Sequence, residues 1–190
     1  MAAELEQVIF ETQADWETWL EANHTKSDGI WIQFAKKNSD KVSQTYDEAL
    51  EVALCFGWID SQKKGLDEDY WLQKFTPRRK RSKWSQRNVK IVEALMAADK
   101  IRPAGMAQIE AAQADGRWDA AYAGSRTITV PEDFAALLAT DPVAQAHFEQ
   151  LNSASRFSIL LQLHDAKRPE TRQRRMQKFF EMCQRQEKPT

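Results

Sequence analysis

The stretch CFGWIDSQKKGLDEDYWLQKFTPRRKRSKWSQRN, residues 55–88, decides the fold of this chain. Gly57 is typical of a residue that ends a helix. The residues at 58–63 then alternate between two sides, as they do in a β-strand. Gly65 supplies a turn residue, and the aromatic run at 70–75 indicates a returning strand. The stretch therefore predicts a β-hairpin that follows directly on a helix.

A basic loop, residues 78–83 with the sequence RRKRSK, follows the hairpin. Ser82 or Ser85 is suited to cap a helix at the end of this loop. Residues 70–92 hold eight Lys/Arg and no Asp/Glu, whereas residues 1–69 hold six basic and fifteen acidic residues. The net charge of −1 therefore hides a segregated pattern, and a local basic patch attracts anions.

Two helix starts precede the hairpin. Thr12 and Thr45 are each followed three residues later by an acidic residue, which is the pattern of a capping box. Short runs of apolar residues at 8–10 and 30–35 have the composition of strands. The N-terminal part is thus expected to contain both strands and helices.

The remainder of the chain is predicted to be helical. Several helix starts are marked by a proline near their first turn: Pro103, Pro131, Pro142 and Pro169. The predicted fold class is α+β, with a small antiparallel sheet and packed helices in residues 1–83 and an all-helical half in residues 84–190. With no clear linker between them, we expect one compact domain.

The composition excludes several classes of protein. A hydrophobic content of 42% with seven tryptophans excludes a disordered chain. The two cysteines, Cys55 and Cys183, indicate no disulfide framework. No signal peptide and no apolar run long enough to span a bilayer are seen, so a soluble cytoplasmic protein is expected.

The basic loop and its neighbours are the predicted anion-binding site. A helix N-terminus beside clustered cations can bind phosphate or a carboxylate. The candidate residues comprise charge contacts, polar caps and aromatic walls: Arg78, Arg79, Lys80, Ser82, Ser85, Asn88, Trp58, Tyr70 and Trp84. The alternative is a solvated loop whose arginines pair with the acidic residues at 67–69.

Glu51 and Asp60 are weak candidates for catalysis. Each carboxylate is surrounded in sequence by apolar residues and would need a partner, for which Arg78 and Arg79 are the obvious choices. One interpretation is a carboxylate–arginine pair that lines a pocket and serves acid–base chemistry, and the other is a structural ion pair or cap that ties the hairpin to the helix.

No metal site or cofactor motif is predicted. The three histidines are scattered, and neither a nucleotide-binding glycine loop nor a nucleophile motif occurs. The last predicted helix carries a second basic surface: Arg172, Arg174, Arg175, Lys178 and Arg185.

Four blocks of sequence resemble the YdeI/OmpD-associated family, also called OmdA or bacteriocin-protection. These blocks are ALCFGWIDSQKKGLD (53–67), FTPRRKRSKWSQRN (75–88), IRPAG (101–105) and AKRPETRQRR (166–175). The resemblance implies an association with an outer-membrane porin and with survival of antimicrobial peptides or bacteriocins. It implies no established reaction, cofactor or catalytic residue set.

The leading hypothesis is a non-enzymatic protein that binds an anionic ligand or protein partner at the hairpin and basic loop, linked to stress or antimicrobial-peptide tolerance. Two alternatives stay open. The first is a nucleic-acid-binding protein using the basic and aromatic stretch 70–90. The second is a small-molecule enzyme with Glu51 or Asp60 as its acid–base group beside an arginine clamp.

Overall fold

The computed structural model describes residues 5–189 and divides the chain into two compact units, Met1–Ala121 and Tyr122–Thr190. The N-terminal unit contains sheet and helices, and the C-terminal unit is helical, so the predicted α+β class is confirmed. The division predicted between residues 83 and 84 does not coincide with this boundary. The reason is that the next two helices pack on the sheet-bearing unit instead of leaving it.

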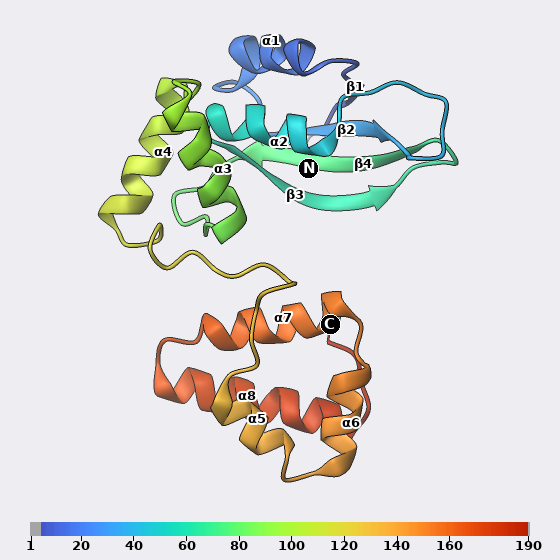
Figure 1. Ribbon diagram of the computed structural model, residues 1–190, viewed down its shortest axis with the longest axis vertical. Helices are drawn as coiled ribbons and strands as arrows, with labels where there is room; N and C mark the ends of the chain where they lie inside the picture. Colours follow the sequence, from blue (N-terminus) through green and yellow to red (C-terminus); the bar gives the residue numbers. More distant parts are fainter. Residues whose placement is uncertain (1–4, 190) are drawn as a thin grey trace. The chain divides into compact units, whose positions relative to one another are not determined.

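The N-terminal unit has a four-stranded sheet and helices on one of its faces (Figure 1). Its elements in chain order are β1 (Gln7–Ile9), α1 (Gln13–Asn23), β2 (Ile30–Ala35), α2 (Tyr46–Cys55), β3 (Trp58–Gly65), β4 (Tyr70–Pro77), α3 (Gln86–Ala97) and α4 (Pro103–Ala114). The strand order is β1-β2-β4-β3. Since β1 pairs in parallel with β2, the sheet is mixed and not purely antiparallel as predicted.

Local signals place these elements where the sequence predicts them. Thr12 and Thr45 both form complete capping boxes at the starts of α1 and α2. After α2 the chain passes through Gly57, whose φ of 72° is in the left-handed region that favours glycine. The hairpin β3–β4 then forms in antiparallel register, with an irregularity between Asp60 and Lys63.

The core of the N-terminal unit lies between the sheet and helices α1 and α2. Trp16 is fully buried there, and its indole Nε1 donates to the backbone oxygen of Ala49 at 3.0 Å. Ile30, Ile32 and Phe34 alternate inward along β2 and are likewise buried. This packing fixes the position of α2, from which the hairpin departs.

The C-terminal unit is built from α5 (Glu132–Leu138), α6 (Pro142–Gln150), α7 (Ser153–His164) and α8 (Pro169–Gln184). Phe134, Phe148 and Phe179 are buried in its core. Arg172 of α8 donates to both carboxylate oxygens of Asp133, at 2.5 and 2.6 Å, and Arg175 donates to the backbone oxygen of Gln162. Part of the predicted basic surface on the last helix therefore holds this unit together.

Candidate functional site

The predicted anion-binding residues separate into buried and exposed groups. Arg78 is buried, its guanidinium lies 3.6 Å from the centre of the Trp84 ring, and its Nη1 donates to the backbone oxygen of Lys83 at 3.1 Å. A guanidinium stacked on an indole is a stable packing arrangement. Arg78 therefore organises the loop, and its burial leaves little of its side chain to serve as the charge contact predicted for it.

Two of the three predicted aromatic walls belong to the core. Trp58 is 1% exposed and Trp84 is 2% exposed. The indole Nε1 of Trp58 donates to the backbone oxygen of His24 at 3.2 Å, and the Trp84 ring packs 4.9 Å from that of Trp118. Neither ring offers a face to a ligand. Tyr70, the third, is half-buried at the end of β4 that is remote from the basic loop.

The predicted polar donors satisfy backbone groups of the loop and of α3. Ser85 is the N-cap of α3, as predicted, and its Oγ accepts from the Asn88 backbone N–H at 3.1 Å. The Oγ of Ser82 accepts from the Arg79 backbone N–H at 2.9 Å. Asn88 itself is buried. These contacts shape the loop and leave four of its cations exposed, namely Arg79, Lys80, Arg81 and Lys83.

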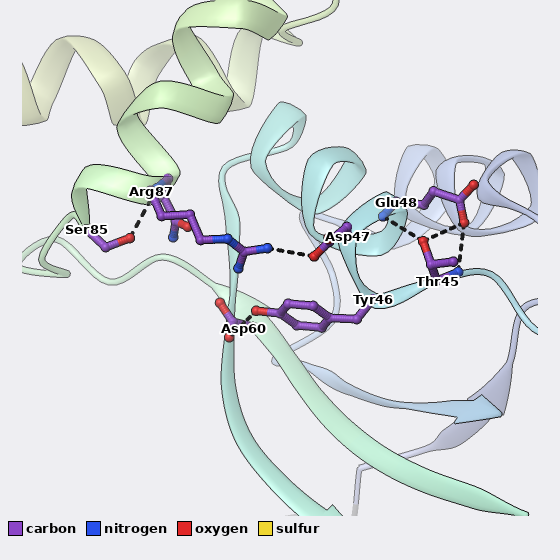
Figure 2. Close-up of polar contacts among 8 residues, drawn as sticks. Thr45, Tyr46, Asp47, Glu48, Asp60, Ser85 and Arg87 are labelled. Atoms are coloured by element: carbon purple, nitrogen blue, oxygen red, sulfur yellow. Dashed lines mark hydrogen bonds and ion pairs between the residues drawn. The ribbon is translucent and has the colours of Figure 1, made fainter. Parts of the chain in front are cut away.

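Asp60 lies in a polar cluster that ties β3 to α2 and α3 (Figure 2). The hydroxyl of Tyr46 donates to Asp60 Oδ2 at 2.9 Å. Arg87, from the first turn of α3, donates to Asp47 Oδ1 at 2.6 Å and lies 5.5 Å from the centre of the Tyr46 ring. The hydrogen bond from Tyr46 to Asp60 joins α2 to β3 and supports the structural interpretation of this carboxylate.

Sequence reasoning missed Tyr46, Asp47 and Arg87. Arg87 and Asp47 are 40 positions apart in the chain, and no periodicity connects them. The only signal was the capping box at Thr45, which fixes the start of α2 and thereby the direction of the two residues that follow.

The cluster makes stability sensitive to high pH. Burial, followed by the charge of Asp60 and the hydrogen bond to it, raises the pKa of Tyr46 well above its ordinary value. A pKa that is raised in the folded state contributes stability that is complete below the unfolded pKa of about 10 and is lost as pH rises above it.

We expect the free energy of unfolding to fall above about pH 10, and less steeply in Tyr46→Phe, which has no phenol at this position to titrate. Urea unfolding from pH 8 to 10.5 would measure both slopes. Identical slopes would show that Tyr46 does not contribute.

Glu51 and Asp60 lie in different surroundings within the N-terminal unit. It is half-buried on α2 and lines a pocket of about 210 Å³ together with Gln13, Glu17, Val52, Cys55, Leu95, Asp99, Lys100 and Arg102. Burial raises the pKa of the Cys55 thiol to about 11, so the nucleophilic thiolate is scarce near neutral pH. Of the two weak catalytic candidates, Glu51 lines this pocket and Asp60 is not among its lining residues.

Within residues 5–189, no group of three or more His, Cys, Asp or Glu side chains is arranged to hold a metal ion. No helix in the same range is long and apolar enough to cross a membrane.

Comparison with known families assigns one family to each unit. Residues 8–108 match the family described as Domain of unknown function (DUF8412), and residues 127–186 match the family described as Bacteriocin-protection, YdeI or OmpD-Associated. Neither curated proteins nor solved structures yielded a match. Of the four blocks that carry the resemblance, only 166–175 lies in the second region; the other three lie in the first.

Neither match crosses the boundary between the two compact units at residues 121 and 122. The first covers more than half of the chain, and the second is the family that the sequence blocks resemble. The chain therefore belongs to the family described as Domain of unknown function (DUF8412), and its C-terminal unit carries a domain of the Bacteriocin-protection, YdeI or OmpD-Associated family.

Proposed function

We propose that this protein is a binding protein that recognises a polyanionic partner through Arg79, Lys80 and Arg81. The observation that carries the proposal is the state of these three side chains. All three are exposed, and none forms an ion pair or a side-chain hydrogen bond with another residue of the described range 5–189. Clustered cations without internal partners give a local positive potential that attracts anions.

The acidic hairpin turn at 67–69 does not neutralise this surface. Asp67 accepts hydrogen bonds from the backbone N–H groups of Asp69 and Tyr70, and Asp69 accepts from the hydroxyl of Ser39. The turn and the basic loop lie at opposite ends of β4, whose eight residues span roughly 25 Å. This separation exceeds the Debye length of about 8 Å at physiological salt.

Recognition by charge is favoured over recognition by base stacking. Trp58 and Trp84 are buried, and Tyr70 lies at the far end of β4, so the loop is not flanked by exposed aromatic rings in the stretch 70–90. Stacking platforms for single-stranded nucleic acid need such rings. The surface supports contacts to phosphate or carboxylate groups that are independent of base sequence.

The cellular role that we propose is tolerance of bacteriocins or antimicrobial peptides, exercised in the cytoplasm. The support for the tolerance role, as distinct from its location, is the description of the family that residues 127–186 match. A deletion strain complemented with wild-type protein or with the Arg79→Gln/Lys80→Gln/Arg81→Gln variant would test this role. If both proteins restore survival equally, the tolerance role does not depend on the basic surface. If the deletion does not affect survival, the tolerance role is contradicted.

Binding should depend steeply on salt and on the three cations. On a single-stranded oligonucleotide, each phosphate contact contributes about 0.7 to the slope of log affinity against log salt. We therefore expect the triple glutamine variant to lose about 2 units of slope if all three cations contact phosphates. Fluorescence anisotropy of a labelled oligonucleotide between low and physiological salt measures this slope.

The matched control is Lys26→Gln/Lys37→Gln/Lys41→Gln, which removes the same charge from exposed positions elsewhere in the N-terminal unit. It should bind almost as the wild type does. Equal weakening in both triple variants would show a general charge effect and contradict a specific surface. Polyglutamate in place of the oligonucleotide tests whether carboxylates substitute for phosphates.

A further inference from the structure

The pocket that contains Glu51 is formed by three separate parts of the N-terminal unit. α1 contributes Gln13 and Glu17, α2 contributes its second half, and the connection from α3 to α4 closes the remaining side. Its volume of about 210 Å³ lies below the range typical of drug-sized ligands. The pocket therefore has room only for a small molecule.

Backbone contacts fix the walls of the pocket. The backbone N–H of Arg102 donates to the backbone oxygen of Cys55 at 3.0 Å, which joins the α3–α4 connection to the end of α2. Gly105 in the first turn of α4 lies so close to Cys55 that an added Cβ would be 2.2 Å from the Cys55 oxygen. Because α2 and α4 are locked together, the pocket exists without a ligand.

Some charged side chains of the pocket form ion pairs with neighbouring residues, and others do not. Arg102 donates to Glu17 at 2.7 Å and to Glu21 at 3.2 Å. By contrast, the side chains of Glu51, Asp99 and Lys100 form no hydrogen bond or ion pair with any residue in the range 5–189. The pocket thus presents two carboxylates and one ammonium group that have no internal partner.

The backbone of Asp99 adopts a conformation that is uncommon for residues other than glycine. Its φ is 54°, in the left-handed region, and it follows the C-cap of α3. The N–H groups of Asp99 and Lys100 donate to the oxygens of Met96 and Leu95, a Schellman arrangement in which glycine is the favoured residue. Glycine would be favoured over aspartate in this conformation, so replacing Asp99 by glycine is expected to raise stability.

We propose that this pocket binds a basic amino acid. Its two ammonium groups match the carboxylates of Glu51 and Asp99, its α-carboxylate matches the ammonium of Lys100, and its methylene chain matches Val52 and Leu95. The charges correspond one to one, and charge-assisted hydrogen bonds of this kind are the strongest that a small polar ligand can form. This site is separate from the exposed basic surface at 79–81.

Cys55 provides the measurement, because it is one of the residues that line the pocket, whereas Cys183 lies in the core of the C-terminal unit. We expect millimolar L-lysine to slow alkylation of Cys55 by iodoacetamide several-fold and to leave Cys183 unchanged, as quantified by mass spectrometry of the intact folded protein. Calorimetric titration gives the affinity directly.

Three variants test the assignment. Glu51→Gln should weaken L-lysine binding about tenfold, since a hydrogen bond to a charged group is lost. Asp99→Gly should also weaken it while raising the urea midpoint, which separates binding from folding. Glu93→Gln, an exposed residue of α3 outside the pocket, is the matched control and should bind as the wild type does.

Absence of L-lysine binding at a ligand concentration of about 10 mM would overturn the proposal, because most specific sites bind far more tightly than this. Equal affinity in Glu51→Gln and Glu93→Gln would also overturn it. Cadaverine, which has two ammonium groups and no carboxylate, should bind more weakly than L-lysine. Equal binding of the two would overturn the role given to Lys100.

Discussion

Replacing Gly105 by alanine is expected to lower the free energy of unfolding of the N-terminal unit by about 2–4 kcal/mol. An added Cβ would lie 2.2 Å from the backbone oxygen of Cys55 and 3.0 Å from that of Leu54. Both atoms belong to the backbone of α2, so no side-chain rotation relieves the overlap. Helix α4 would have to move away from α2, which disrupts the packing of both.

The sign of this effect is informative because helix propensity predicts the opposite. Within a helix, alanine is favoured over glycine by about 1 kcal/mol. A loss of stability in Gly105→Ala would therefore demonstrate the close contact between the helices. Gly65→Ala is the matched control, since an added Cβ there meets no atom within 4 Å.

Urea unfolding followed by tryptophan fluorescence is the appropriate measurement. All seven tryptophans of the chain lie between residues 16 and 118, so the signal comes from the N-terminal unit. Comparable midpoints for Gly105→Ala and Gly65→Ala would contradict the tight crossing of α2 and α4. A stabilised Gly105→Ala would contradict it more strongly.

Replacing Trp58 by alanine is the second large change, with an expected loss of about 3–5 kcal/mol. The ring is 1% exposed and packs edge-on against Trp16 and Trp19, with centroids at 6.1 and 5.8 Å. Its removal leaves a cavity bounded by these two rings and also leaves the backbone oxygen of His24 without its indole donor. Truncating a tryptophan that lined an open groove would lower the free energy of unfolding far less.

Two further variants separate these interpretations. Trp58→Phe keeps an aromatic ring and is expected to lose less stability than the alanine variant. Trp31→Ala removes a half-exposed indole of β2 and should also lose less. If Trp58→Ala and Trp31→Ala had equal effects on the urea midpoint, Trp58 would not be a core residue.

A backbone contact at the base of the hairpin keeps the first basic residue of the loop away from the surface. Trp58 follows Gly57 directly, and the Gly57 backbone oxygen accepts from the backbone N–H of Arg78 at 3.0 Å. The first basic residue of the loop is thereby held at the base of the hairpin and turned toward Trp84. Only from Arg79 onward does the chain leave the core and expose its charges.

Much of the local structure was determined by the sequence alone. The capping boxes at Thr12 and Thr45, the buried strand at 30–35 and the left-handed Gly57 all occur where the sequence predicts them. Each depends on residues within a few positions of one another, whose side chains satisfy nearby backbone groups or alternate across a strand. The block at 166–175 resembles the YdeI/OmpD-associated family and lies inside the region that matches this family.

Only the tertiary structure decided which polar and aromatic residues reach the surface. Arg78 and Trp84 stand beside exposed cations in sequence and yet are buried, while Glu51 and Asp60, considered together, lie in separate surroundings. These outcomes depend on partners that are distant in the chain. A side chain's environment is set by the elements that fold over it, and neighbouring letters in the sequence do not encode that arrangement.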